Sequence, residues 1–139
     1  MRDKTNMTKE NILIVDDEPV ILNTSSEILR RAGYKVITVS SGEDGYEQLK
    51  TGEFDAVITD IKMSGMGGIA FIKKIREDVS ADIPIIVITG HGTIDTAIES
   101  MKHGAQGFIL KPFTPFELKS SVEDVIRKSN IIRENMRLK

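Results

Sequence analysis

Five side chains of this sequence that could carry out chemistry each stand where a run of apolar residues ends. Three are carboxylates, one is a hydroxyl and one is an ammonium: Asp16, Asp17, Asp60, Thr89 and Lys111. The apolar runs are short and rich in β-branched residues, which predicts buried strands. If those strands are parallel neighbours, their carboxyl ends meet at one edge of one sheet, and the five groups gather in a shallow cleft.

A cluster of this composition suits a divalent metal ion and a phosphoryl group. Closely packed carboxylates repel one another, and a hard cation such as Mg²⁺ relieves the repulsion while accepting oxygen ligands. A carboxylate can also act as a nucleophile and form an acyl phosphate. The metal ion and an ammonium group would then neutralise charge on the phosphoryl oxygens. The pattern therefore predicts phosphoryl chemistry on an aspartate.

Each residue also has a simpler explanation. Asp16 and Asp17 could lie in a solvated loop, and Asp60 could cap a helix. Thr89 could be an ordinary strand residue, and Lys111 a surface lysine in a turn. Chemistry is favoured because the groups fall at the ends of four strands of one predicted sheet, and chance agreement at all four places is improbable.

The elements that must position these groups alternate between strands and helices. Strands are predicted over residues 11–16, 34–39, 54–59, 84–89 and 106–110. Helices are predicted over residues 18–32, 42–51, 67–77 and 94–103, with a last helix from about residue 115. Apolar strands separated by helices predict an α/β fold, a three-layer, doubly wound, five-stranded parallel sheet covered on both faces. A common strand order of such sheets, 2-1-3-4-5, places Asp16 and Asp17 beside Asp60.

Capping residues mark where several of these helices begin and end. Ser41, Thr93 and Thr114 each precede a helical pattern, as N-cap residues do. Gly33 follows the first helical pattern, as a C-terminal glycine does. Thr114 and Glu117 also have the spacing of a capping box, so the last helix has a defined start.

The composition fits one globular domain and excludes several kinds of site. Of 139 residues, 40% are hydrophobic and 29% charged, and the formal net charge of −2 argues against nucleic acid as the default partner. There is no cysteine for a disulfide or a thiolate metal site, and two histidines make an imidazole-based zinc site implausible. The apolar runs are far shorter than the ~20 residues of a membrane span. The polar arm over residues 1–9 lacks the apolar core of a signal peptide, so we expect a cytoplasmic protein.

Four motifs resemble the receiver domain of two-component response regulators, a CheY-like superfamily. They are Asp16-Asp17-Glu18-Pro19, Thr59-Asp60-Ile61-Lys62-Met63, Ile88-Thr89-Gly90-His91-Gly92 and Phe108-Ile109-Leu110-Lys111-Pro112-Phe113. The resemblance spans about residues 10–128 and implies the flavodoxin-like fold of that family. Residues 89–97 and 101–105 further resemble the receivers of NtrC-type, σ54-dependent transcription activators.

The resemblance implies a role for each group of the cluster. Asp60 would be the phosphoacceptor, and Lys111 would pair with the phosphoryl oxygens. Mg²⁺, or Mn²⁺ in its place, would be held by Asp16, Asp17 and Asp60 with the backbone carbonyl of Lys62. The phosphoryl group would come from a sensor histidine kinase or a phosphotransfer protein.

The same resemblance implies a switch and a rim around the site. Thr89 would hydrogen-bond a phosphoryl oxygen, and Phe108 would swing inward when Thr89 moves. The surface of the fourth helix, fifth strand and fifth helix would then change. Gly90, which has no side chain, would leave the approach to Asp60 open. Lys62 and His91 would rim the site and affect the water that hydrolyses the aspartyl phosphate, unless both are ordinary solvated loop residues.

One loop departs from the family pattern. Ser64 stands where the family usually has proline, and Gly67 where it usually has aspartate. Proline would stiffen the loop through its fixed φ, whereas serine among three nearby glycines predicts a mobile loop. We therefore expect an effect on loop order and metal affinity, with all five chemical groups retained.

The C-terminal segment continues a heptad pattern beyond the last strand. Its apolar seam has one polar interruption and consists of Leu118, Val122, Val125, Ser129, Ile132 and Met136. Basic residues over 127–139 are more typical of favourable charge at a helix C-terminus than of a DNA-binding patch. Residues 129–139 are thus expected to form a helical extension. It could be a dimer helix, a linker to a lost effector domain, or residues left over from cloning.

Three classes of function follow from these observations. The leading one is a signalling switch that catalyses only its own phosphotransfer and dephosphorylation, rather than an ordinary enzyme. The second, a phosphohydrolase with an aspartyl intermediate, is disfavoured because such enzymes commonly carry an acid where Lys62 stands. The third, a phosphorylation-independent interaction module, is disfavoured by the complete set of acids, hydroxyl and lysine. No DNA-binding helix pair or phosphate-binding Gly-rich loop is evident, so we expect no direct nucleic acid contact.

Overall fold

The structure is a computed structural model that describes residues 10–90 and 92–138, leaving aside the side chains of residues 133 and 135–138. The strands are β2 (Asn11–Val15), β3 (Lys35–Val39), β4 (Ala56–Thr59), β5 (Ile85–Thr89) and β6 (Gly107–Leu110). The helices are α1 (Pro19–Arg31), α2 (Gly42–Thr51), α3 (Gly68–Asp78), α4 (Ile94–Lys102) and α5 (Pro115–Leu138). The predicted bounds agree with these to within two residues.

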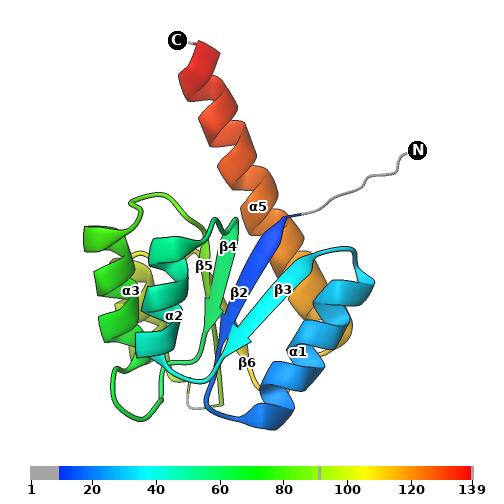
Figure 1. The fold of residues 1–139 in the computed structure, drawn as a ribbon, viewed down its shortest axis with the longest axis vertical. Helices are drawn as coiled ribbons and strands as arrows, with labels where there is room; N and C mark the ends of the chain where they lie inside the picture. Colours follow the sequence, from blue (N-terminus) through cyan, green and yellow to red (C-terminus); the bar gives the residue numbers. More distant parts are fainter. Residues whose placement is uncertain (1–9, 91, 139) are drawn as a thin grey trace.

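The five strands form one parallel sheet in the order β3-β2-β4-β5-β6 (Figure 1). In chain order this is second, first, third, fourth and fifth, so the predicted fold class and strand order are confirmed. The order reverses between β2 and β4, whose last residues, Val15 and Thr59, lie in register. Sheets of this kind form ligand sites beside such a reversal, outside the carboxyl ends of the strands.

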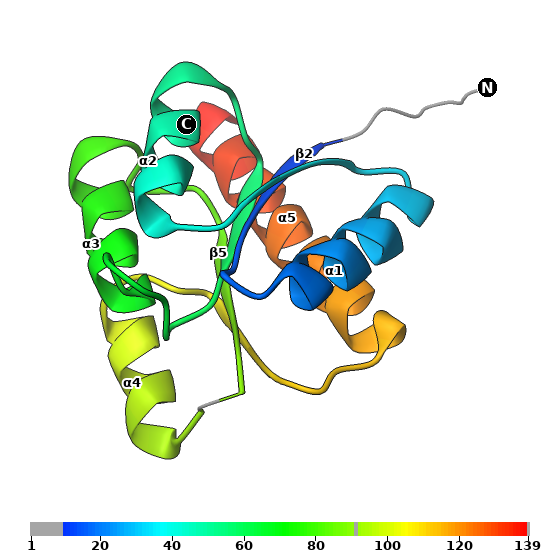
Figure 2. The ribbon, with the colours of Figure 1, turned by 60° about the horizontal axis from the view of Figure 1, so that its bottom comes forward.

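Alternate residues along each strand point to opposite faces of the sheet, and both faces are buried. On β2, Ile12 and Ile14 join the core beneath α1 and α5, whereas Leu13 and Val15 join the core beneath α2 and α3. Figure 2, with the lower edge of Figure 1 turned forward, shows α1 and α5 on one side and α2, α3 and α4 on the other. Burial on both sides explains why the strands are continuously apolar.

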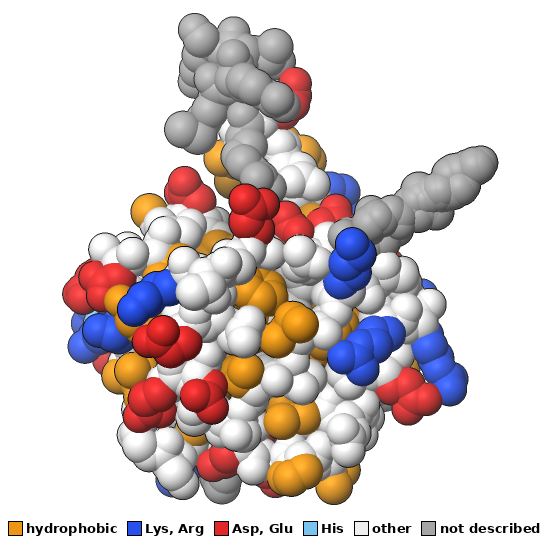
Figure 3. Space-filling view, viewed as in Figure 1, with side chains coloured by type: hydrophobic (Ala, Val, Ile, Leu, Met, Phe, Trp, Pro, Cys, Tyr) orange, Lys and Arg blue, Asp and Glu red, His pale blue; other side chains and the backbone are white. Residues whose placement is uncertain are grey.

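The edge strand β3 is less covered than the inner strands. Ile37 is 45% exposed, although Val36 on the same strand is buried. Figure 3 shows hydrophobic side chains across the middle of this face. The inner strands β2, β4 and β5 therefore contribute most of the core, and they also deliver the acids and the hydroxyl of the predicted site.

Side-chain caps fix the starts of three helices as the sequence predicts. The Ser41 hydroxyl accepts the Asp44 N–H at 3.1 Å at the start of α2, and Thr93 forms a capping box with Thr96 at the start of α4. Before α5, the predicted box has Thr114 Oγ1 accepting from Glu117 N at 3.1 Å and Glu117 Oε1 accepting from Thr114 N at 2.7 Å. After α1, Gly33 has φ 102°, the left-handed conformation that favours glycine.

The last helix continues beyond the domain. Its first half is buried through Leu118 and Val122, whereas Ile131 and Ile132 are 53% and 58% exposed. In Figure 1 the helix projects from the sheet edge opposite the carboxyl ends of the strands. The predicted helical extension lies here, although the side chain of Met136 falls outside the described part. None of the described helices has the length and apolar character needed to span a bilayer.

Candidate functional site

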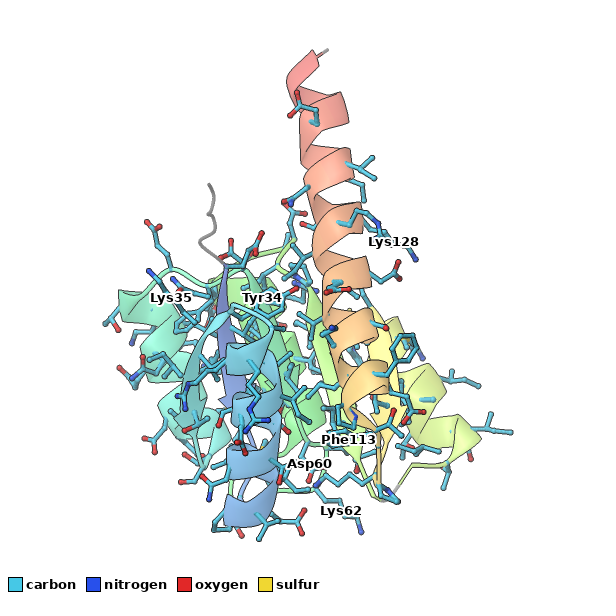
Figure 4. The ribbon with its side chains drawn as sticks, turned by 90° about the vertical axis from the view of Figure 1, so that its right-hand side faces the viewer. Tyr34, Lys35, Asp60, Lys62, Phe113 and Lys128 are labelled. Carbon is cyan, nitrogen blue, oxygen red and sulfur yellow. The ribbon has the colours of Figure 1, made fainter. Side chains whose placement is uncertain are left out.

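Four strands deliver polar side chains to one edge of the sheet. Thr89 is the last residue of β5, and the other three are held because the backbone hydrogen bonding continues one residue beyond the strand. These bonds run from Asp16 N–H to Val39 O (3.2 Å), from Asp60 N–H to Val15 O (3.1 Å) and from Lys111 N–H to Thr89 O (2.9 Å). Figure 4 shows Asp60 at this edge, away from the projecting end of α5. The predicted convergence of the strand ends is therefore present.

Three carboxylates gather at this edge. Oxygens of Asp16, Asp17 and Asp60 lie within 4.8 Å of one another, and Asp16 and Asp60 are buried. Burial raises the pKa of Asp16, as does the charge of Asp60, while hydrogen bonds from the Glu18 N–H and Lys111 oppose the rise. All three donors are carboxylate oxygens, so the chemistry of this set fits a hard cation such as Mg²⁺ or Mn²⁺.

The two carboxylate oxygens of Asp60 have different surroundings. Oδ1 accepts hydrogen bonds from the backbone N–H of Ile61 at 2.7 Å and of Lys62 at 3.3 Å. Oδ2 lies 3.0 Å from the ammonium nitrogen of Lys111. The loop after β4 therefore fixes the orientation of the carboxylate, while a positive charge faces its other oxygen.

Lys111 provides the positive charge of the cluster. Its Nζ lies 3.0 Å from Asp16 Oδ2, 3.0 Å from Asp60 Oδ2 and 2.5 Å from Glu18 Oε1, with the lysine side chain 12% exposed. Burial by itself lowers the pKa of Lys111, but hydrogen bonds to these carboxylates outweigh burial and raise it. The ammonium is therefore charged at neutral pH and available to neutralise an anion beside Asp60.

The predicted switch residues lie on the neighbouring strands β5 and β6. Thr89 is fully buried at the end of β5 and pairs in register with Leu110. Phe108 is partly buried against the core beneath α2 and α3. A Cβ added at Gly92 would lie 3.0 Å from the Phe108 ring, so Gly92 packs closely against that ring. Thr89 and Phe108 thus lie on adjacent strands, two residue pairs apart in the register.

The predicted rim is described only in part. Lys62 is exposed beside Asp60 (Figure 4). A Cβ added at Gly90 would make ordinary contacts of 3.8 Å with Cβ and Cδ of Lys111, so glycine leaves free space beside the aliphatic part of that side chain. His91, the other predicted rim residue, lies outside the described residues.

Two carboxylates hold the loop between β4 and α3. Asp17 Oδ2 accepts from the Ser64 N–H at 3.4 Å, and Glu43 Oε2 accepts from the Met66 N–H at 3.1 Å. Gly65 has φ 73°, and a Cβ there would lie 2.8 Å from Glu43 Oε2. The loop therefore has acceptors for two of its backbone N–H groups although it lacks the family's proline. Glycine is needed at position 65 for its left-handed conformation, whereas an added Cβ would displace only the end of the Glu43 side chain.

The sequence reasoning assigned no role to three residues that shape the site. Glu18 pairs with Lys111. The sequence feature that could have indicated this role is that Glu18 is a third acid directly after Asp16 and Asp17. Gly68 is the first residue of α3 and lies so close to Asp60 that an added Cβ would be 2.1 Å from the Asp60 carbonyl oxygen. The sequence feature that could have indicated this close approach is the pair of consecutive glycines, Gly67 and Gly68. Glu43 approaches the loop from α2, and nothing in the sequence pattern marks that contact.

Comparison with known proteins identifies the family. Residues 12–123 match the response regulator receiver domain. The chain is 37% identical over 123 residues to the probable transcriptional regulator ycf27 of Guillardia theta, covering 88% of this chain and 48% of that protein. It is 33% identical over 128 residues to the transcriptional regulatory protein ZraR of Escherichia coli K12, covering 91% of this chain and 29% of that protein.

Structural comparison agrees with the sequence comparison. The crystal structure of NtrX from Brucella abortus superposes with a TM-score of 0.90 at 29% identity, covering 95% of this chain and 30% of that one. The chain thus spans about half the length of ycf27, and under a third of ZraR and NtrX. With its fold, strand-end cluster and family match in agreement, this chain belongs to the response regulator receiver domains, the phosphorylation-activated switches of two-component systems.

Proposed function

We propose that Asp60 is the residue of this receiver domain that accepts the phosphoryl group, in a reaction that requires Mg²⁺ or Mn²⁺. One observation carries the proposal: a buried Asp60 carboxylate lies within a cluster of three acids and 3.0 Å from the Lys111 ammonium. Asp16 and Asp17, with the backbone carbonyl of Lys62, would hold the metal ion. The ion would neutralise charge on the phosphoryl oxygens while Asp60 reacts.

The donor would be a phosphohistidine on a sensor histidine kinase or a phosphotransfer protein. An oxygen of Asp60 attacks phosphorus, an O–P bond forms, and the P–N bond to the donor imidazole breaks with its electron pair going to nitrogen. Charge on the phosphoryl oxygens is neutralised by Lys111, which supplies N–H donors. The loop N–H groups that bind Asp60 Oδ1 keep the carboxylate oriented for this attack.

Phosphorylation would be read out at the surface of α4, β6 and α5. Thr89 would turn toward the phosphoryl group and Phe108 would move with it, shifting the balance between two arrangements of this surface. Exposed apolar side chains support a protein-binding role here: Ile94 is 80%, Ile98 59% and Leu110 55% exposed.

The partners of this surface would be an effector domain or a second copy of the chain. The exposed Ile131 and Ile132 on the extension of α5 support either arrangement. Because relatives such as ZraR are transcriptional regulators, the absence of direct nucleic acid contact by this chain stays a prediction. We also propose a cytoplasmic location, which family membership supports.

Phosphorylation by a small-molecule donor tests the proposal without a kinase. The chain is incubated with acetyl phosphate and Mg²⁺, and intact mass spectrometry follows the gain of one phosphoryl group. We expect that gain in wild type and its loss in Asp60→Asn or after chelation of Mg²⁺. Equal labelling of wild type and Asp60→Asn would refute the assignment of Asp60.

A further inference from the structure

The ammonium of Lys111 has as many carboxylate partners as it has hydrogens. An ammonium group carries three N–H donors. The carboxylates of Asp16, Glu18 and Asp60 lie 3.0, 2.5 and 3.0 Å from Nζ. Lys111 must therefore give up at least one of these partners before it can donate a hydrogen bond to a phosphoryl oxygen on Asp60.

Glu18 differs from the two buried partners of Lys111. Its side chain is 58% exposed, against 3% for Asp16 and 4% for Asp60. Glu18 occupies the N-cap position of α1, yet its side chain makes no capping hydrogen bond there. Among the described residues, the carboxylate is paired with Lys111, 93 positions along the chain. The side chain is therefore committed to the lysine rather than to its own helix.

The three partners differ in what their release would cost. Releasing Asp16 would leave a buried carboxylate with the Glu18 N–H at 3.0 Å but without its ammonium partner, which is unfavourable. Asp60 would itself carry the phosphoryl group. Glu18 can pass into water because most of its side chain is already exposed. Glu18 is therefore the partner that Lys111 exchanges at least cost.

We propose that, in the unphosphorylated protein, the Glu18 carboxylate occupies the Lys111 donor that a phosphoryl oxygen takes after phosphorylation. The inference rests on the proposed role of Asp60. Glu18 would be a positioning residue that acts through Lys111 and opposes entry of the anionic phosphoryl group. Removing its carboxylate would free one N–H donor and favour the phosphorylated state.

The test compares Glu18→Gln and Glu18→Ala with wild type and with Glu47→Gln. Glu47 lies on α2, where its exposed carboxylate pairs with Lys50 at 3.5 Å, so its substitution gives the same charge change away from the site. Phosphorylation rates with acetyl phosphate are measured at fixed Mg²⁺, together with affinity for beryllofluoride, a phosphoryl analogue. We expect both Glu18 variants to gain about twofold to fivefold in rate and affinity, and Glu47→Gln to match wild type.

A further variant separates contact from charge. Glu18→Asp keeps the carboxylate but shortens its reach to Lys111, so we expect a rate between those of wild type and Glu18→Gln. The NMR chemical shift of the Lys111 ammonium, measured without metal ion or phosphoryl donor, should change in all Glu18 variants because the carboxylate partner of the lysine is lost or moved. A role limited to anchoring the start of α1 would leave the beryllofluoride affinity unchanged.

The possible failures can be told apart. If Asp60 is not labelled in wild type, the proposed function fails whatever the Glu18 variants do. If Asp60 is labelled but every Glu18 variant matches wild type in rate and affinity, the inference about Glu18 fails alone. Slower phosphorylation and weaker beryllofluoride binding in Glu18→Gln would also overturn it, because Glu18 would then be holding Lys111 in its productive position.

Discussion

At the scale of single residues, the site is an excess of negative charge around one ammonium. Lys111 is paired with two buried carboxylates and one exposed carboxylate. Asp17, which is exposed, lies beside the buried acids, and no lysine or arginine of the described residues is paired with it. An added cation at Asp17 would relieve repulsion that Lys111 alone leaves in place. This imbalance is the physical basis for a metal ion at the site.

Asp17 should therefore affect metal affinity more than fold stability. In Asp17→Asn we expect Mg²⁺ to bind more than about tenfold more weakly, because the amide keeps the shape but loses the charge that a hard cation requires. The rate of phosphorylation should fall with it. Affinity would be measured by calorimetric titration, with Asp44→Asn on the first turn of α2 as a control of equal charge change. Unchanged Mg²⁺ affinity in Asp17→Asn would remove this residue from the metal site.

A second residue-scale prediction concerns pH and lies away from the site. Burial raises the pKa of Tyr34 to about 12, from 10.0 in the unfolded chain, with Glu123 and Glu10 adding to the rise. The folded state therefore favours the protonated phenol. That stabilisation is complete below pH 10 and is lost as pH rises through about 12.

Tyrosinate absorbance would measure the pKa in wild type and in Tyr34→Phe, in which Tyr46 is the remaining tyrosine. The spectral component lost in the variant should titrate near 12. Above pH 10, wild type should lose stability to urea relative to Tyr34→Phe. A component titrating at the ordinary value of 10.0 would contradict the burial of this phenol by its neighbours.

At the scale of elements, the strands and most helix ends were predictable because each signal is local. A strand buried on both faces must be apolar, and a cap needs one residue type at one position. The ion pair between Glu18 and Lys111 joins residues 93 positions apart. The hydrogen bond from the Met66 N–H to Glu43 forms only when α2 packs beside the loop between β4 and α3. The need for glycine at position 68 likewise arises only from the close packing of the start of α3 against the Asp60 backbone. These contacts depend on tertiary structure, so the sequence pattern could not reveal them.

The element-scale prediction concerns the connection from β5 to β6. Thr89→Ala should still permit phosphorylation, because the hydroxyl is not part of the acid and lysine cluster. It should reduce the change around Phe108, since the hydroxyl would link the phosphoryl group to that ring. Backbone amide shifts on beryllofluoride binding would be compared by NMR. Equal shifts around Phe108 in wild type and Thr89→Ala would show that the signal does not pass through this hydroxyl.

At the scale of the whole molecule, the site and the exposed extension lie at opposite edges of the sheet. Helix α5 begins four residues after Lys111, packs along the domain through Leu118 and Val122, and emerges at the far edge (Figures 1 and 4). One continuous helix therefore connects the site edge to the surface around Ile131 and Ile132. We propose that a change beside Lys111 is carried along this helix to a partner at the other end of the domain.

The central claim is that the phosphoryl group is carried by Asp60, and chemical trapping tests it most directly. Borohydride reduces an aspartyl phosphate to homoserine, which marks the modified residue permanently. The chain would be treated with acetyl phosphate and Mg²⁺, reduced, digested and sequenced by tandem mass spectrometry. The account predicts homoserine at position 60, absent when Mg²⁺ is chelated. Homoserine at position 16 or 17 instead, with position 60 unmodified, would contradict it.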